Sequence, residues 1–149
     1  MQERFETFTV LINRISRNIR RIKNQEMAEY NLRSSHISCL YYIYSLESAT
    51  ATDLCERCEE DKATVSRSLD YLESNGYITR EGESAKRYKS PLYLTPKGAE
   101  VGKKIADKID GVLDLVSHGI TEEERISFYR YLSIISDSLE AVSKSGERN

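Results

Sequence analysis

Apolar residues near both ends of the chain recur at alternating spacings of three and four, which is the heptad pattern of an amphipathic helix. Near the N-terminus the pattern comprises Phe5, Phe8, Ile12, Ile15, Ile19 and Ile22. Near the C-terminus it comprises Phe128, Leu132, Ile135, Leu139 and Val142. Each end is therefore predicted to form a long helix with an apolar seam that must pack against another helix.

Between these ends, residues suited to helix N-caps precede three shorter apolar patterns. Ser34 or Ser35 is expected to cap the first of these helices, Thr52 the second and Asp61 the third. Asn75-Gly76 supplies a left-handed stop for the third helix. The apolar faces of these helices are expected to consist of Ile37, Leu40, Tyr41, Ile43, Tyr44, Leu54, Val65, Leu69 and Leu72.

After the third short helix the pattern changes to that of a β-hairpin. Residues 77–80 and 91–94 are β-prone runs on either side of a long polar loop. Thr95-Pro96 then opens a long helix, because Thr suits the N-cap and Pro suits the first turn. Thr121 and Glu124 have the spacing of a capping box for the last helix.

This order of elements predicts a mainly α fold with a small β-hairpin wing. Residues 1–149 are expected to form a single unit with a winged helix-turn-helix at 33–95. Residues 1–30 and 96–145 are expected to form a helical dimerisation region, because a bundle shared by two chains would cover both apolar seams. The predicted dimer interface comprises Phe5, Phe8, Ile12, Ile15, Ile19, Phe128, Leu132, Ile135 and Leu139.

Length and composition exclude several classes of protein. A chain of 149 residues suits one domain, and its three cysteines are too few and odd in number for a disulfide scaffold. The longest uninterrupted apolar run, residues 39–44, is far shorter than the roughly 20 residues that span a bilayer. The acidic start also lacks the pattern of a signal peptide. We therefore expect a cytoplasmic protein that does not associate with membranes.

The net charge of −2 gives no sign of a nucleic-acid partner, but the charges are unevenly distributed. In a helix-turn-helix the second helix enters the major groove with its N-terminal residues near the bases. On the helix that begins at Lys62, Arg67 is suited to a bidentate contact with guanine, and Lys62 to a phosphate or guanine. The expected DNA-contacting residues of this helix are Lys62, Ala63, Thr64, Ser66 and Arg67. The alternative is an ordinary solvated helix.

The polar loop of the hairpin is basic at its tip and on its return. Arg87 is expected to enter the minor groove, because Arg suits a narrow and electronegative groove. Lys86 and Lys89 are expected to contact phosphates. A loop that is merely solvated is the alternative.

Four segments occur in an order and at separations that make nearly the full length of the chain resemble the MarR family of bacterial transcriptional regulators. They are TDLCER at 52–57, DKATVSR at 61–67, LESNGYI at 72–78 and LYLTPKG at 92–98. The resemblance implies a homodimer, expected to be a repressor, that binds a pseudo-palindromic operator on double-stranded DNA and is released by a small ligand or an oxidant. Many relatives carry Asp-x-Arg in the wing. Here Lys86 and Tyr88 occupy those two positions with Arg87 between them, which leaves open the side chain that reaches the groove.

A tyrosine-rich patch is the candidate effector pocket. It comprises Tyr30, His36, Tyr41 and Tyr44, and the resemblance implies a small aromatic ligand between the dimer bundle and the winged region. Aromatic residues at helical spacing are also typical of an ordinary core, which is the alternative.

No motif predicts catalysis, a metal site or a cofactor. Cys55 and Cys58 form a C-x-x-C pair, but no second pair or nearby His completes a tetrahedral set, and Cys39 is expected to be a core residue. The chain has no Gly-rich phosphate loop, nucleophile elbow or zinc-hydrolase helix motif. Two alternatives to a ligand-released DNA-binding regulator remain: a winged-helix protein-interaction module and a thiol-responsive switch.

Overall fold

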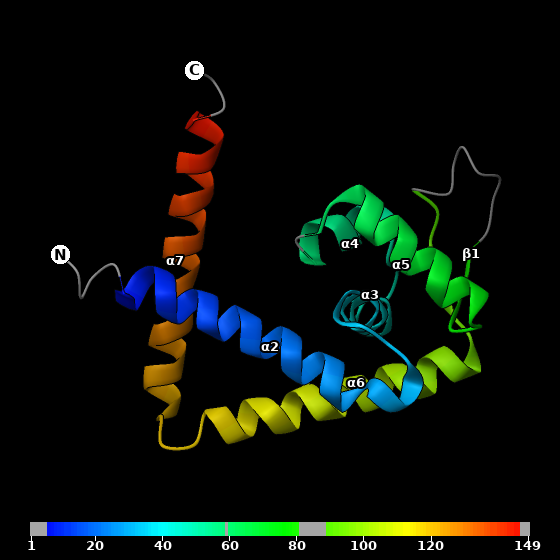
Figure 1. The fold of residues 1–149 in the computed structure, drawn as a ribbon, viewed down its shortest axis with the longest axis horizontal. Coiled ribbons are helices and arrows are strands. Elements are labelled where there is room, and N and C mark those ends of the chain that lie inside the picture. The colour runs from blue at the N-terminus through cyan, green and yellow to red at the C-terminus, as the bar shows by residue number, and fades with distance from the viewer. Residues whose placement is uncertain (1–5, 59, 81–88, 147–149) are drawn as a thin grey trace. The chain divides into compact units, whose positions relative to one another are not determined.

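The computed structural model describes residues 6–58, 60–80 and 89–146, which form two compact units (Figure 1). The first unit extends to Ile109 and the second begins at Asp110, within a helix that continues from one to the other. The elements are η1 (Glu6–Leu11), α2 (Ile12–Glu26), η2 (Ala28–Tyr30), α3 (Ser34–Ser45), α4 (Ala51–Cys58), α5 (Lys62–Ser74), β1 (Ile78–Arg80), β2 (Leu92–Leu94), α6 (Pro96–Val116) and α7 (Glu122–Gly146). The predicted fold class, mainly helical with one small hairpin, is confirmed.

The hairpin is a two-stranded antiparallel sheet that is also tied to the turn before α4. Ile78 pairs with Leu94, Thr79 with Tyr93 and Arg80 with Leu92. The Leu92 backbone N–H donates to the Ala49 carbonyl at 2.8 Å. This bond and the packing of both strands stabilise a hairpin too short to be stable alone.

The core of the first unit is formed by the apolar faces of α3, α4, α5, the hairpin and the start of α6. Its buried apolar residues are Met27, Leu32, Ile37, Cys39, Leu40, Ile43, Ala49, Ala51, Leu54, Val65, Leu69, Leu72, Tyr77, Ile78, Leu92, Val101 and Ile105. Most of the predicted helix faces are therefore buried. Tyr41 is half-buried and Tyr44 remains 38% exposed, so these two tyrosines lie at the edge of the core.

Two of the predicted N-caps are wrong. The first helix of the winged region begins at Ser34, and the imidazole Nδ1 of His36 accepts from the Arg33 backbone N–H at 3.1 Å. The next helix begins at Ala51 rather than after Thr52. Thr50 accepts from the Asp53 N–H at 3.3 Å and the Asp53 carboxylate accepts from the Thr50 N–H at 2.8 Å, which is a reciprocal capping box.

The other caps are confirmed. Asp61 caps α5 by accepting from the Thr64 N–H at 2.8 Å, and Gly76 after this helix has a φ of 74°. Thr121 and Glu124 exchange side chain to backbone bonds of 2.8 and 3.3 Å at the start of α7.

The N-terminal helix starts with a π-helical segment, η1, before it becomes regular at Ile12. The wider turns rotate the preceding residues relative to the heptad that follows, so the predicted uninterrupted heptad is wrong in this segment. Phe5 lies outside the described residues. Its predicted interface partners Phe8, Ile12, Ile15 and Ile19 are between 38% and 49% exposed.

In the second unit, α7 also presents apolar side chains to solvent. Phe128 and Leu139 are each 50% exposed, Leu132 is 37% exposed and Ile135 is half-buried. Within the described ranges no helix is long and apolar enough to cross a membrane.

Candidate nucleic-acid interface

The candidate interface is the outer face of the first two turns of α5. Val65, Ser68, Leu69 and Leu72 are buried, which fixes the rotation of the helix. The structure places the five predicted DNA-contacting residues together at its N-terminal end. Lys62, Ala63, Ser66 and Arg67 are exposed and Thr64 is half-buried.

A chain of hydrogen bonds runs from the cap of α5 to the arginine expected to contact guanine. The Thr64 hydroxyl donates to Asp61 Oδ2 at 3.0 Å, and Arg67 Nη2 donates to Thr64 Oγ1 at 3.0 Å. Hydrogen bonds from the Thr64 backbone and side chain hold the pKa of Asp61 below its usual value. Asp61 is therefore a functional candidate that the sequence analysis treated only as a cap; its signal was the three-residue spacing of Asp61, Thr64 and Arg67.

The acidic residues later on α5 have a partner on the wing. The guanidinium of Arg80, at the end of β1, donates from Nη2 to Asp70 Oδ1 at 2.7 Å and from Nε to Glu73 Oε2 at 3.0 Å. The sequence analysis did not identify this contact, because no local motif brings a strand residue onto a helix that precedes it.

Only part of the predicted wing contact can be placed. Lys86 and Arg87 lie outside the described residues. Lys89 is exposed, three residues before β2.

The four residues of the candidate effector pocket have separate packing partners. The His36 ring stacks on Tyr71, with 4.1 Å between centroids, while Tyr41 meets Tyr42 edge-on at 5.3 Å. A Cβ at position 102 of α6 would lie 2.9 Å from Tyr44 Cβ, so Tyr44 packs directly against this helix. The Tyr30 carbonyl accepts from the Tyr77 hydroxyl at 3.3 Å. These contacts fit packing residues as well as a pocket, which stays a prediction.

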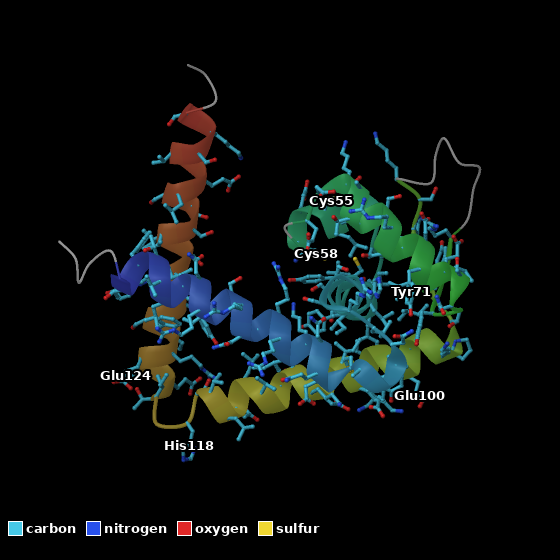
Figure 2. The ribbon with its side chains drawn as sticks, in the orientation of Figure 1. Cys55, Cys58, Tyr71, Glu100, His118 and Glu124 are labelled. Atoms are coloured by element: carbon cyan, nitrogen blue, oxygen red, sulfur yellow. The ribbon has the colours of Figure 1, made fainter. Side chains whose placement is uncertain are left out.

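Tyr71 is a further residue that the sequence analysis missed. The Tyr71 side chain, labelled in Figure 2, donates from its hydroxyl to the Asn31 carbonyl at 2.9 Å, and its ring stacks on that of His36. Burial, and to a smaller extent the charge of Arg33, lower the pKa of His36. A neutral His36 that accepts from Arg33 N and stacks on Tyr71 links the start of α3 to α5.

The Cys58 thiol is in hydrogen-bonding contact with the Cys39 thiol. Cys39 is buried, and Cys58 is half-buried at the end of α4, where Figure 2 labels it beside Cys55. The hydrogen bond from Cys39, followed by the Lys23 charge, lowers the pKa of Cys58, whereas the bond to Cys58 and burial raise that of Cys39. In the described part of the chain, the structure shows no group of three or more His, Cys, Asp or Glu side chains placed to hold a metal ion.

A short helix, a tight turn, an exposed capped helix and a two-stranded wing together define a winged helix-turn-helix protein. Residues 30–87 match the family model described as the MarR family. The chain therefore has a winged helix-turn-helix fold and is similar to the MarR family over this segment. A search of curated protein sequences found no match.

Solved structures of this family have the same fold. The MarR-family transcriptional regulator from Silicibacter pomeroyi is 27% identical, with a TM-score of 0.72 and 84% of each chain covered. MepR of S. aureus, solved as a complex with DNA, is 20% identical with a TM-score of 0.78, covering 89% of this chain and 97% of MepR. A MarR-family regulator from Neisseria meningitidis is 18% identical with a TM-score of 0.82, covering 96% of this chain and 98% of its own.

Proposed function

We propose that the chain is a sequence-specific DNA-binding transcriptional regulator that binds a pseudo-palindromic operator as a homodimer and acts as a repressor. The observation that carries the proposal is the exposed N-terminal face of α5, where Lys62, Ser66 and Arg67 surround the hydrogen-bonded Thr64. The similarity to the MarR family and the DNA complex of MepR support the same function.

The side chains of this face have the chemistry for base and phosphate contacts. The planar guanidinium of Arg67 can donate two hydrogen bonds to guanine, at O6 and N7. Because the Thr64 hydroxyl gives its hydrogen to Asp61 and accepts from Arg67, its role in the free protein is to hold the guanidinium at the N-terminal end of the helix. Lys62, at the first helical position, suits a phosphate beside the groove.

The apolar seams support a dimer. Ile12, Ile15 and Ile19 on α2 and Phe128 and Leu139 on α7 are large apolar residues that are all more than a third exposed in the single chain. Contiguous exposed apolar surface marks an interaction site. A two-fold dimer would present two copies of α5 to two half-sites one helical turn apart.

Selection of bound sequences from random duplex DNA, with the purified full-length protein, tests the proposal. A dimer should enrich two inverted half-sites about 10–10.5 base pairs apart, centre to centre. Arg67→Ala should cost about 1–3 kcal/mol of binding free energy and relax the preference at one position of each half-site. The matched control Arg125→Ala removes an exposed arginine from α7 and should leave the selected motif unchanged. Failure to enrich any motif at low salt would instead favour a protein-interaction module.

Release by a small aromatic effector is a separate part of the proposal. Its support is the concentration of aromatic residues on two neighbouring elements, with Tyr30 on η2 and His36, Tyr41 and Tyr44 on α3. A set of aromatic carboxylates titrated into the protein–operator complex should contain a compound that releases DNA, and Tyr44→Ala should weaken that release. If no compound shifts the binding curve or the melting temperature of the free protein, the pocket is an ordinary core edge.

Thiol control of DNA binding is the second candidate, and the contact between Cys39 and Cys58 favours it. Diamide accepts two electrons and two protons from this pair as the disulfide bond forms. Treatment should therefore change the operator affinity of the wild type and leave Cys58→Ser unaffected, with Cys55→Ser behaving as wild type. An identical response of wild type and Cys58→Ser would exclude this pair.

A further inference from the structure

Arg80 joins β1, the first strand of the wing, to α5, which is the recognition helix of the proposed function. Its Nη2 donates to Asp70 Oδ1 at 2.7 Å, and both Nη2 and Nε donate to Glu73 Oε2. The Arg80 side chain is 8% exposed, while those of Asp70 and Glu73 are 63% and 30% exposed. The cation is thus enclosed by the fold, and its partners lie three residues apart on one face of α5.

We propose that Arg80 is a positioning residue that holds the wing at a fixed orientation to the recognition helix, so that both elements engage the same DNA. This inference rests on the proposed DNA-binding function. It assigns Arg80 no contact with DNA, because its guanidinium is already committed to two carboxylates.

The hairpin needs such a contact. Its strands are three residues long and pair with each other at Ile78–Leu94, Thr79–Tyr93 and Arg80–Leu92, and Leu92 is also bridged to Ala49. A two-stranded ribbon of this length is marginal without tertiary support. Ile78 and Leu92 anchor one face of the sheet in the core, but apolar packing is non-directional. A planar guanidinium bonded to two carboxylates fixes direction as well as distance.

The position of Arg80 in the chain allows it to set the direction of the wing relative to α5. It is the last residue of β1, at the point where the chain leaves the sheet toward the polar loop. Asp70 and Glu73 lie on α5 after the DNA-facing residues, on the half of the helix that leads to the hairpin. A change in the angle between β1 and α5 at this point would change the direction in which the chain leaves the sheet.

A second effect of the same ion pairs is to offset part of the negative charge of the two carboxylates on α5. Burial alone would lower the pKa of Arg80, but the hydrogen bonds to Glu73 and Asp70 raise it, so the residue stays charged. Neutralisation and positioning make different predictions. A variant in which all three side chains are neutral removes the need for a counter-charge but not the need for a fixed wing.

The test is a double-mutant cycle on operator affinity, measured by fluorescence anisotropy. Arg80→Met should lose about tenfold in affinity, as expected for a misplaced set of contacts worth about 1.4 kcal/mol. The wing variant Arg87→Ala/Lys89→Ala should weaken binding in the wild type and much less when combined with Arg80→Met, because a wing that is no longer positioned has little contact to lose. Arg125→Met, which removes an exposed arginine from α7, is the matched control and should bind as wild type.

Three results would overturn the inference. These are additive losses in the cycle, a wing variant without effect on the wild type, and full recovery of affinity in the neutral triple variant Asp70→Asn/Glu73→Gln/Arg80→Met. Arg80→Lys keeps the charge and guards against a variant that does not fold. The Arg80→Lys variant should retain part of the affinity, because its ammonium keeps the charge but cannot bond both carboxylates in the fixed geometry of the planar guanidinium.

A measurement without DNA separates this inference from the proposed function. Arg80→Met should speed amide hydrogen exchange in β1 and β2 and leave the amides of α6 unchanged. Unchanged exchange in the strands would show that Arg80 does not position them, whatever the protein binds. Faster exchange in a protein that selects no DNA motif would instead refute the proposed function while showing that Arg80 holds the strand.

Discussion

Replacing Gly98 by alanine should destabilise the protein strongly, although alanine is the better helix former. Gly98 lies in the first turn of α6, where the helix crosses the backbone that enters β1. A Cβ at this position would lie 1.8 Å from the Tyr77 carbonyl oxygen and 2.8 Å from its carbon. Both atoms belong to the backbone, so no side-chain rotation relieves the clash.

The size of the destabilisation follows from how far α6 and the Tyr77 backbone must separate to make room for the added carbon. To reach the 3.0 Å that real Cβ contacts respect, α6 and the Tyr77 backbone must separate by about 1.2 Å. Overpacking typically costs about 1–3 kcal/mol, and a backbone obstacle places this site at the upper end. The shift also strains the bond from the Gly98 N–H to Thr95 Oγ1, at 3.0 Å, and loss of an N-cap costs about 1 kcal/mol. The intrinsic gain of alanine over glycine in a helix offsets about 1 kcal/mol, which leaves a net loss of about 3 kcal/mol.

Two glycines of the same helix supply matched controls. Gly111 has nothing within 4 Å of the added carbon, so Gly111→Ala should stabilise the protein by about 0.5–1 kcal/mol. At Gly102 the added carbon meets the Tyr44 side chain at 2.9 Å, and because a side chain can yield, Gly102→Ala should fall between the two.

Urea unfolding followed by circular dichroism measures all three variants, at one fixed protein concentration because the stability of the proposed dimer would depend on it. If Gly98→Ala unfolds at the same urea concentration as the wild type, the close approach of α6 to Tyr77 does not exist. A loss for Gly111→Ala as large as that for Gly98→Ala would show that the effect is not steric.

Three further predictions concern the interface and its supports. Arg87→Ala should weaken binding chiefly to operators with A·T-rich flanks, and equal loss on G·C-rich flanks would remove the minor-groove assignment. Iodoacetamide should alkylate Cys58 at lower pH than Cys39, and Cys39→Ala should move the Cys58 profile to higher pH because the hydrogen bond that lowers its pKa is gone; an unmoved profile contradicts the pairing. The folded-state pKa of Asp61 is depressed by bonds from Thr64, so its contribution to stability is present above the unfolded value of about 3.9 and is lost as pH falls through the folded value. Asp61→Asn, an equally good cap, should therefore flatten the melting temperature between pH 2 and 5 relative to wild type.

Elements specified by neighbouring residues were predictable from the sequence. The cap at Asp61, the capping box of Thr121 with Glu124 and the two strands of the hairpin all depend on spacings of a few residues. The same reasoning placed the residues predicted to contact DNA at the N-terminal end of α5. It failed where several hydroxyl residues competed for one cap: Thr50 rather than Thr52 has an acid three residues later to complete a capping box.

Contacts between elements could not be predicted from the sequence. Cys39 and Cys58 meet because α3 and α4 pack together, although C-x-x-C spacing pointed to Cys55. Arg80 meets Asp70 because the hairpin folds back along α5. No local periodicity encodes either approach, since both depend on how packed apolar faces orient the elements that carry them.

These contacts change how the net charge of residues 61–90 is interpreted. Residues 61–90 contain six basic and five acidic residues, which suggests a nearly neutral DNA-binding region. The structure divides them differently: Arg80 is occupied by Asp70 and Glu73, and Asp61 caps α5 and reaches Arg67 through Thr64. The cations predicted to contact DNA are Lys62 and Arg67 on α5 and Lys86, Arg87 and Lys89 of the wing. So few phosphate contacts per subunit imply weak non-specific binding, because that binding is supplied by phosphate contacts and counterion release. Tight binding would then require two correctly spaced half-sites, which is why the orientation of the wing to α5 matters in each subunit.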